Sequence, residues 1–227
     1  MSPPSQSIVI AVDGTAASGK GTLAKRLAQH FGFAHLDSGA LYRLTALAVL
    51  EAKGDPKNHA DAVKGAQTID FNLAGDPKIR TDIIGKAASE VAAIPAVRQA
   101  LLDFQQDFLA RPPGGSPGAV MDGRDIGTVI CPGAAAKLYI DARLDIRARR
   151  RWQELKTMGI RRAEQDVVAE LEARDAADKS RPISPLKLAP DADLLDTSDL
   201  GIDAAFAAAL ALVSPKVNGA LKDRHRG

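Results

Sequence analysis

A glycine-rich stretch near the start of the chain has the residue types and spacing of a phosphate-binding loop. Residues 14–22 read Gly-Thr-Ala-Ala-Ser-Gly-Lys-Gly-Thr, between the apolar run 8–12 and a helix-like stretch from Leu23 to His30. Glycines let successive backbone N–H groups point at a phosphate chain, the helix start adds a positive dipole, and Lys20 adds a full charge. A plain strand-to-helix turn needs no such combination. The stretch therefore predicts binding of nucleotide phosphates.

The residue after the lysine narrows the class. The general pattern places Ser or Thr next to Lys, where the hydroxyl reaches Mg²⁺. Here Gly21 takes that place and the hydroxyl follows at Thr22. This ending resembles nucleoside monophosphate kinases more than GTPases or motor ATPases. The glycines also lack the Gly-x-Gly-x-x-Gly spacing of a dinucleotide site.

Charged residues follow a second apolar stretch. Asp122 closes the run 119–122 and precedes Gly123, Arg124 and Asp125. A carboxylate at a strand end beside a phosphate loop is placed to hold Mg²⁺-bound water. The plainer interpretations are a turn cap for Asp122 and a weak surface ion pair for Arg124 and Asp125. Ligands of parallel sheets bind at the carboxyl ends of strands, so we favour a functional role.

Two arginine patterns could neutralise phosphate charge. Arg147, Arg150 and Arg151 share one face of a predicted helix, which is either a solvated basic face or a mobile lid acting in phosphoryl transfer. A second pattern recurs at i, i+4 and i+7. It consists of Arg174, Asp178 and Arg181. This is either a surface ladder or a phosphate clamp with an acceptor for ribose hydroxyls.

Hydrophobic periodicity places these residues on an alternating pattern of elements. Strands are expected at 8–12, 33–36, 119–122, 136–141 and 192–196, with an exposed strand at 68–73. Helices are expected at 22–30, 38–53, 81–93, 97–109, 144–157, 163–179 and 202–213, with Ser38 as an N-cap. This alternation predicts a parallel sheet covered on both faces, with the phosphate loop after the first strand.

Composition limits the alternatives. A chain of 227 residues with a net charge of +2 is too balanced for a nucleic-acid coat. The segment from Arg143 to Arg181, however, contains nine Arg and two Lys but eight acidic residues, and this local excess of positive charge fits a nucleotide partner. The single Cys131 excludes an internal disulfide, and the four histidines have no metal-ligand spacing. We expect no signal peptide, no membrane span and a cytoplasmic location.

Further motifs resemble bacterial cytidylate kinase, in order, over residues 7–213. These motifs are Asp37-Ser38-Gly39-Ala40-Leu41-Tyr42-Arg43, Ile79-Arg80-Thr81, residues 88–98 (ASEVAAIPAVR), residues 122–128 (DGRDIGT), and residues 174–181 (RDAADKSR) followed by Pro185-Leu186. The resemblance implies an α/β fold of the P-loop NTPase type: a parallel five-stranded sheet flanked by helices, with a small CMP-binding insert and a helical lid. It implies one kinase domain over 1–227, with a core at about 7–54, 117–145 and 190–213. The monophosphate-binding region would span about 37–110 with a reduced insert at 55–80, the lid about 146–180, and a flexible tail 214–227.

The same resemblance assigns roles by motif. Binding of ATP falls to Gly14, Thr15, Ala16, Ala17, Ser18, Gly19, Lys20, Gly21 and Thr22. The CMP phosphate falls to Ser38, Arg43, Arg174 and Arg181, and the ribose hydroxyls to Asp178. Cytosine is read by Ser89, Arg98 and Asp125, with Arg124 also at the substrate. The catalytic set is Lys20, Asp122, Arg147, Arg150 and Arg151, with Mg²⁺ held through water near Thr22 and Asp122.

Three departures from the family pattern affect this interpretation. Thr15 and Ala16 replace a usual Pro-Ser, which a backbone cradle tolerates. Ala177 stands where an arginine is common, so one phosphate or lid contact is absent. The segment 55–80 is short, so a reduced hairpin around 68–80 is expected in place of an inserted sheet.

The expected activity is transfer of phosphate from ATP to CMP or dCMP by a monomer, without nucleic-acid or membrane partners. One rival is a kinase for another small acceptor, such as a different nucleotide or shikimate. The other is a regulatory module that senses ATP without turnover.

Overall fold

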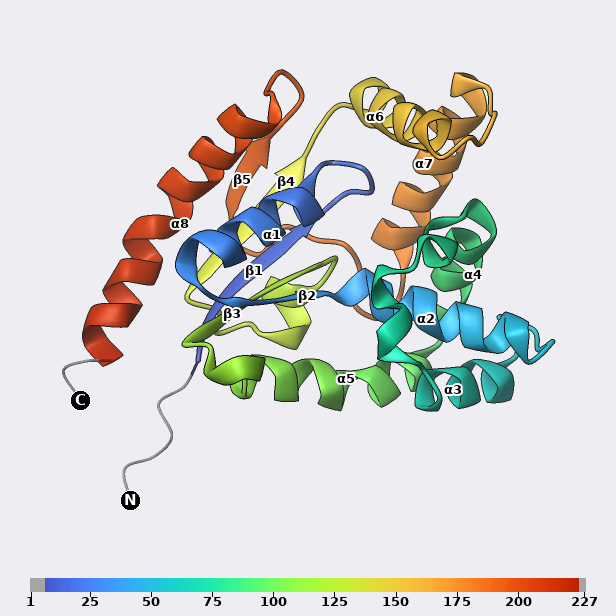
Figure 1. Cartoon of the computed structure of the whole chain (residues 1–227), viewed down its shortest axis with the longest axis horizontal. Coiled ribbons are helices and arrows are strands. Elements are labelled where there is room, and N and C mark those ends of the chain that lie inside the picture. The colour runs from blue at the N-terminus through green and yellow to red at the C-terminus, as the bar shows by residue number, and fades with distance from the viewer. Residues whose placement is uncertain (1–6, 225–227) are drawn as a thin grey trace. The chain divides into compact units, whose positions relative to one another are not determined.

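The structure is a computed structural model that describes residues 7–224. These residues form two compact units. The first comprises 7–36 and 109–224, and the second comprises 37–108. The bounds of the second unit differ by two residues from those of the predicted monophosphate-binding region, about 37–110. Figure 1 colours the chain along its length.

The first unit is built on a five-stranded sheet in the order β2-β3-β1-β4-β5 (Figure 1). The strands are β1 (Ile8–Gly14), β2 (Ala34–Asp37), β3 (Gly118–Gly123), β4 (Ala136–Asp141) and β5 (Asp193–Asp196). β1 pairs in parallel with β3 and β4, and β4 with β5. Every residue of β1 is buried, as a central parallel strand covered on both faces requires.

Two helices cover one face of this sheet. They are α1 (Lys20–Phe31) and α8 (Ile202–Arg224). Leu23 and Leu27 of α1 and Val213 and Val217 of α8 belong to one apolar cluster with Ile10 and other strand residues. The helix α1 ends at Gly32, whose left-handed backbone (φ 65°) lets its N–H return to the last turn.

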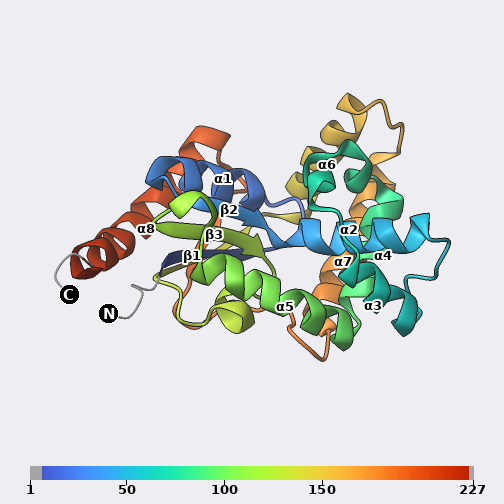
Figure 2. The ribbon, with the colours of Figure 1, turned by 60° about the horizontal axis from the view of Figure 1, so that its bottom comes forward.

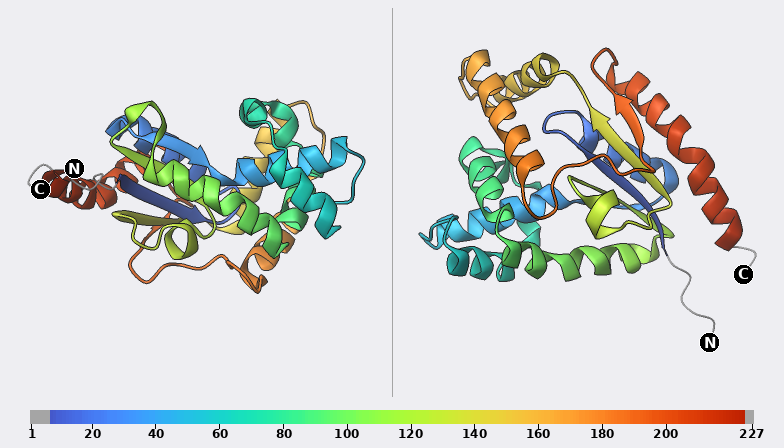
Figure 3. Two further views of the ribbon diagram at one scale, coloured as in Figure 1. Left: turned by 90° about the horizontal axis from the view of Figure 1, so that it is seen from below. Right: turned by 180° about the vertical axis from the view of Figure 1, so that it is seen from behind.

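A helical pair follows β4 in the first unit. It consists of α6 (Leu144–Thr157) and α7 (Glu164–Ser180), which pack against each other (Figure 3). Ala148 and Leu155 of α6 meet Val167 and Leu171 of α7 in a small apolar cluster. That cluster includes Ala16 of the glycine-rich loop, so the predicted lid packs on the predicted phosphate loop.

The second unit is helical. It contains α2 (Ser38–Glu51), α3 (His59–Gln67), α4 (Asp82–Ala92) and most of α5 (Pro95–Ala110). α2 packs against both α3 and α4, as Figure 2 shows. Gly65 allows the close approach of α3 to α2, because a Cβ there would lie 2.5 Å from Val49 Cγ2. The N-cap of α2 is Asp37, which accepts from Ala40 N, and the predicted cap Ser38 is the first helical residue.

The predicted exposed strand 68–73, and the hairpin around 68–80, are wrong. The helix α3 ends at Gln67, and the segment after it forms two 3₁₀ turns, η1 (Phe71–Gly75) and η2 (Pro77–Arg80). Asp70 and Asp76 accept backbone N–H groups at the starts of these turns, at 2.9 and 2.8 Å. Such side-chain acceptors favour turns over strand pairing.

The last helix runs further than expected. The predicted end at 213 and flexible tail from 214 are wrong for the described residues, because α8 continues to Arg224. Pro215 removes one helical hydrogen bond, but Val217 is fully buried beyond it, and Lys216 forms an ion pair with Asp193 (2.7 Å). Residues 225–227 of that tail lie outside the described residues.

The expectation that no segment approaches a membrane span also needs correction. Among the described residues, one helix, α8, is long enough and apolar enough to cross a membrane, judged by length and composition only. One face of α8 packs into the core cluster of the sheet. Length and composition alone are weak evidence for a membrane helix.

Candidate active site

The glycine-rich loop after β1 has a backbone that glycine makes possible. A Cβ on Gly14 (φ 149°) would lie 2.0 Å from the carbonyl oxygen of Ile140, so no other residue fits there. Ala17 and Gly19 adopt left-handed conformations (φ 58° and 89°), which curl the chain into α1. No side chain caps the N-terminus of α1, and its first N–H groups remain suited to an anion.

Lys20 begins α1 and folds back over this loop. Its Nζ donates to the carbonyl oxygen of Thr15 at 3.2 Å. The Ser18 hydroxyl donates to the same oxygen at 3.0 Å, and the Thr15 hydroxyl donates to Asp141 at 2.7 Å. Side chains of the loop thus hold its backbone, and the Lys20 ammonium group contacts the carbonyl oxygen of Thr15. Thr22 lies exposed on the first turn of α1.

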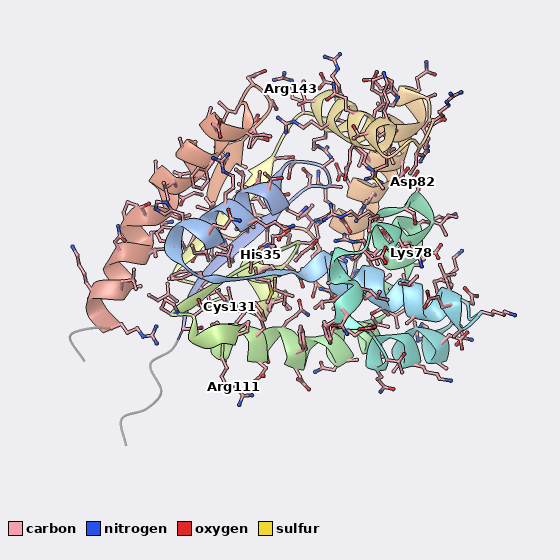
Figure 4. The ribbon with its side chains drawn as sticks, viewed as in Figure 1. His35, Lys78, Asp82, Arg111, Cys131 and Arg143 are labelled. Atoms are coloured by element: carbon pink, nitrogen blue, oxygen red, sulfur yellow. The ribbon has the colours of Figure 1, made fainter. Side chains whose placement is uncertain are left out.

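Asp122 lies beside the start of α1, at the carboxyl end of β3. A Cβ on Gly21 would lie 3.5 Å from Asp122 Oδ2, so this oxygen faces the first helical turn. The other oxygen, Oδ1, accepts from Nε2 of His35 at 2.8 Å. His35, labelled in Figure 4, comes from β2. The sequence prediction missed His35, because the contact joins residues far apart in the chain.

A cluster of guanidinium groups surrounds Asp178 of α7. Arg124 Nε donates to Asp178 Oδ2 at 2.8 Å, and Arg181 Nη2 lies 3.8 Å from Asp178 Oδ1. Burial opposes ionisation of this carboxyl, but Arg124, then Arg174 and Arg181, outweigh it and lower its pKa. The structure therefore brings together the predicted set Arg174, Asp178 and Arg181 and adds Arg124.

Asp13, a residue without a predicted role, holds the turn after β3. Its two carboxylate oxygens accept the backbone N–H groups of Ile126 and Gly127, both at 2.8 Å. Burial raises its pKa to about 6. The charge of Asp125 also raises the pKa. The two N–H groups and the charge of Arg124 lower it, but by less than burial raises it. Asp125 is buried and precedes the π-helical turn η4 (Ile126–Ile130).

The three predicted lid arginines have different surroundings. Arg147 is buried: its guanidinium pairs with Asp175 at 2.7 Å and donates to the carbonyl oxygens of Ala142 (2.8 Å) and Ala16 (3.1 Å). Arg147 thus ties α6 to both α7 and the glycine-rich loop.

Arg150 and Arg151 lie further along α6. Arg150 donates to the carbonyl oxygen of Thr197 at 2.6 Å and to its hydroxyl at 3.0 Å. The Thr197 hydroxyl in turn donates to the carbonyl oxygen of Ser18, so Arg150 is connected to the loop. Arg151 pairs with Glu154 at 3.0 Å.

The remaining predicted residues belong to the second unit. Arg43 donates to Asp37 at 2.6 Å. The Ser89 hydroxyl donates within its helix to Gly85, and the buried Arg98 stacks over the Tyr42 ring at 5.4 Å. The residues predicted to bind CMP are thus distributed over both units. The second unit carries Ser38, Arg43, Ser89 and Arg98, and the first carries Arg124, Asp125, Arg174, Asp178 and Arg181.

No group of three or more His, Cys, Asp or Glu within residues 7–224 is arranged to hold a metal ion. Asp122 is the carboxylate next to the start of α1. Magnesium in kinase sites is held largely by phosphate oxygens and water, with one or two carboxylates. The donor set of this chain fits that arrangement.

The sheet order, the glycine-rich loop after the central strand and the arginine-bearing helices define a phosphate-loop kinase of the α/β class. A family model for cytidylate kinase matches residues 10–214. A cytidylate kinase of Rhodospirillum rubrum is 49% identical over 92% of this chain and 98% of its own. A cytidylate kinase of Bradyrhizobium diazoefficiens is 50% identical over 91% of this chain and 95% of its own. The chain belongs to the cytidylate kinase family.

A solved structure shares the fold. An uncharacterized protein from Eubacterium ventriosum aligns with a TM-score of 0.53 at 15% identity, covering 92% of this chain and 99% of its own. At that identity the likeness concerns the fold alone.

Proposed function

We infer that this enzyme transfers the γ-phosphoryl group of ATP to CMP and dCMP, giving CDP and dCDP with ADP. The observation that carries this conclusion is the match to the cytidylate kinase family over nearly the whole chain. The enzyme is thus a nucleotide-binding transferase of pyrimidine metabolism.

The donor phosphates lie in the loop of residues 14–22. Its backbone N–H groups and the start of α1 hold the phosphate oxygens. Lys20 leaves the carbonyl oxygen of Thr15, 3.2 Å away, to bind the β- and γ-phosphates. Its charge matters most in the transition state, where the γ-phosphoryl oxygens carry spread negative charge.

Mg²⁺ enters with ATP in this proposal. Asp122 would hold a bound water from the end of β3, and Thr22 lies on the neighbouring helical turn. The buried Asp122 carboxylate, fixed by His35 and facing Gly21, fits that task. When bound, the ion supplies charge neutralisation on the phosphates.

The acceptor needs no strong general base, because the CMP phosphate is already a dianion at neutral pH. Its oxygens would be bound by guanidinium groups through charge-assisted hydrogen bonds. We assign this to Arg43, Arg174 and Arg181 with Ser38, and the ribose hydroxyls to Asp178. Arg124 holds Asp178 ionised and in place at 2.8 Å.

The base is read by hydrogen bonds in this proposal. The Asp125 carboxylate accepts from the cytosine N4 amine and repels the O4 of uracil. Arg98 donates to cytosine N3 or O2, and Ser89 completes the set. Sites of this kind discriminate well, because the wrong base leaves polar groups unpaired.

The helices α6 and α7 form the lid. Arg150 and Arg151 would neutralise charge on the transferred group, while Arg147 positions the lid on the loop through Ala16. Lid closure would exclude water and suppress hydrolysis of ATP. We propose that the enzyme acts as a monomer in the cytoplasm.

The variant Asp125→Asn tests the assignment of the base. It removes the repulsion of uracil O4 and offers it an amide donor. We expect the preference for CMP over UMP in kcat/KM to narrow by about 1–3 kcal/mol, mainly through lost CMP activity. Asp103→Asn, an exposed carboxylate on α5, is the matched control and should keep the wild-type ratio. An unchanged ratio in Asp125→Asn would show that Asp125 does not read the base.

A further inference from the structure

Asp13 is a buried carboxylate to which the roles above assign nothing. Asp13 is the last residue but one of β1 and is 4% exposed. Each oxygen accepts one backbone N–H, from Ile126 and from Gly127, both at 2.8 Å. These are consecutive amides, and they begin η4 directly after Asp125. Asp13 therefore fixes the two peptide planes on either side of Ile126.

The same turn also packs against Lys137. A Cβ on Gly127 would lie 3.1 Å from Lys137 Cδ and 3.4 Å from Asp13 Oδ2. The Lys137 stem is itself fixed, because its Nζ binds both carboxylate oxygens of Asp191 at 2.9 and 2.8 Å. The turn is thus held by the Asp13 carboxylate and packed against the Lys137 stem.

A carboxylate at such a buried position is costly, and burial raises the pKa of Asp13 to about 6. Asparagine would avoid that cost, but its side chain has a single acceptor oxygen. It can satisfy one of the two amides and would turn a donor toward the other. The double acceptance is therefore what the carboxylate provides.

We propose that Asp13 is a positioning residue for acceptor-base specificity, which fixes the turn that carries Asp125 and acts through Asp125. This inference rests on the proposed role of Asp125 in reading the base. It makes the strand before the phosphate loop part of the acceptor-specificity apparatus.

Asp13→Asn is the first test, with kcat/KM measured for CMP and for UMP. One buried N–H loses its acceptor, and we expect the CMP-to-UMP ratio to fall about fivefold or more. The KM for ATP should stay within about twofold. Asp70→Asn is the matched control, since Asp70 also accepts a backbone N–H (Asn72, 2.9 Å) but lies outside the assigned sites. Its ratio should not change.

The double variant Asp13→Asn with Asp125→Asn tests the route of the effect. If Asp13 acts through Asp125, the double variant should have the ratio of Asp125→Asn alone. Losses that multiply would overturn the proposal. A ratio that responds to Asp125→Asn and not to Asp13→Asn would overturn the role of Asp13 alone. A ratio that does not respond to Asp125→Asn would remove the proposed base reading, and this inference with it.

Gly127→Ala supplies a second perturbation if Asp13→Asn does not fold. The added methyl group lies against the Lys137 stem and the Asp13 carboxylate and displaces the turn, while the residue at position 13 stays aspartate. We expect a reduced CMP-to-UMP ratio with a near-normal KM for ATP. A folded Gly127→Ala variant with the wild-type ratio would overturn the proposal.

Discussion

Arg147→Met is expected to lower the free energy of unfolding by about 3–5 kcal/mol. The guanidinium group is 6% exposed and its partner Asp175 is 10% exposed, at 2.7 Å. Removing one partner of a buried pair leaves an uncompensated charge, which costs about that much. Among residues 7–224, no second donor replaces Arg147, because Oδ1 of Asp175 accepts no hydrogen bond there. The carbonyl oxygens of Ala16 and Ala142 also lose their donor.

Urea denaturation followed by circular dichroism measures this effect, and a second substitution tests its cause. Arg147→Met with Asp175→Leu removes both charges and should recover most of the loss. Arg149→Met on the same helix is the control, because Arg149 is 67% exposed and lies 3.9 Å from Glu164. Its cost should stay below about 1 kcal/mol. Wild-type stability of Arg147→Met with a lost kcat would refute the reasoning and favour a direct transition-state role for Arg147.

Three further outcomes are expected. Lys20→Ala should abolish phosphoryl transfer and leave the melting curve unchanged, and a near-wild-type kcat would contradict the phosphate-loop assignment. Arg174→Ala or Arg181→Ala should raise the KM for CMP about ten- to a hundredfold and the KM for ATP far less; weakened ATP binding alone would assign the clamp to the donor. The pKa of Asp13 rises from 3.8 in the unfolded chain to about 6 on folding, so its contribution to stability is complete below pH 3.8 and is lost as pH rises to 6. Between pH 4 and 7 the wild type should therefore lose about 2–3 kcal/mol relative to Asp13→Asn, measured by denaturation at each pH, and a constant difference would contradict the raised pKa.

The sequence predicted the elements that carry strong local signals. The strand 136–141 and the helix 144–157 have the predicted bounds, because each is a clear apolar run or a periodic stretch. The segment 68–73 alternates like a strand, but Asp70 and Asp76 offer its backbone local acceptors, and turns form instead. The residues from 214 on were predicted as a flexible tail, whereas burial of Val217 carries α8 past Pro215 to Arg224.

The candidate site was predictable in its motifs and not in its internal contacts. The i, i+4, i+7 spacing correctly placed Arg174, Asp178 and Arg181 together. Helical spacing could not show that Arg147 is buried against Ala16, 131 residues away. Nor could a local pattern reveal that Asp13 accepts from the amide of Gly127, 114 residues away. A carboxylate that closes an apolar strand was the one available signal for Asp13.

An acceptor panel tests the central claim most directly. The purified protein would be given ATP with CMP, dCMP, UMP, AMP, GMP or shikimate, and ADP release would be followed in a coupled assay. The account predicts efficient turnover with CMP and dCMP and a much lower kcat/KM with every other acceptor. Preferred turnover of another acceptor, or ATP binding without turnover of any of them, would contradict it.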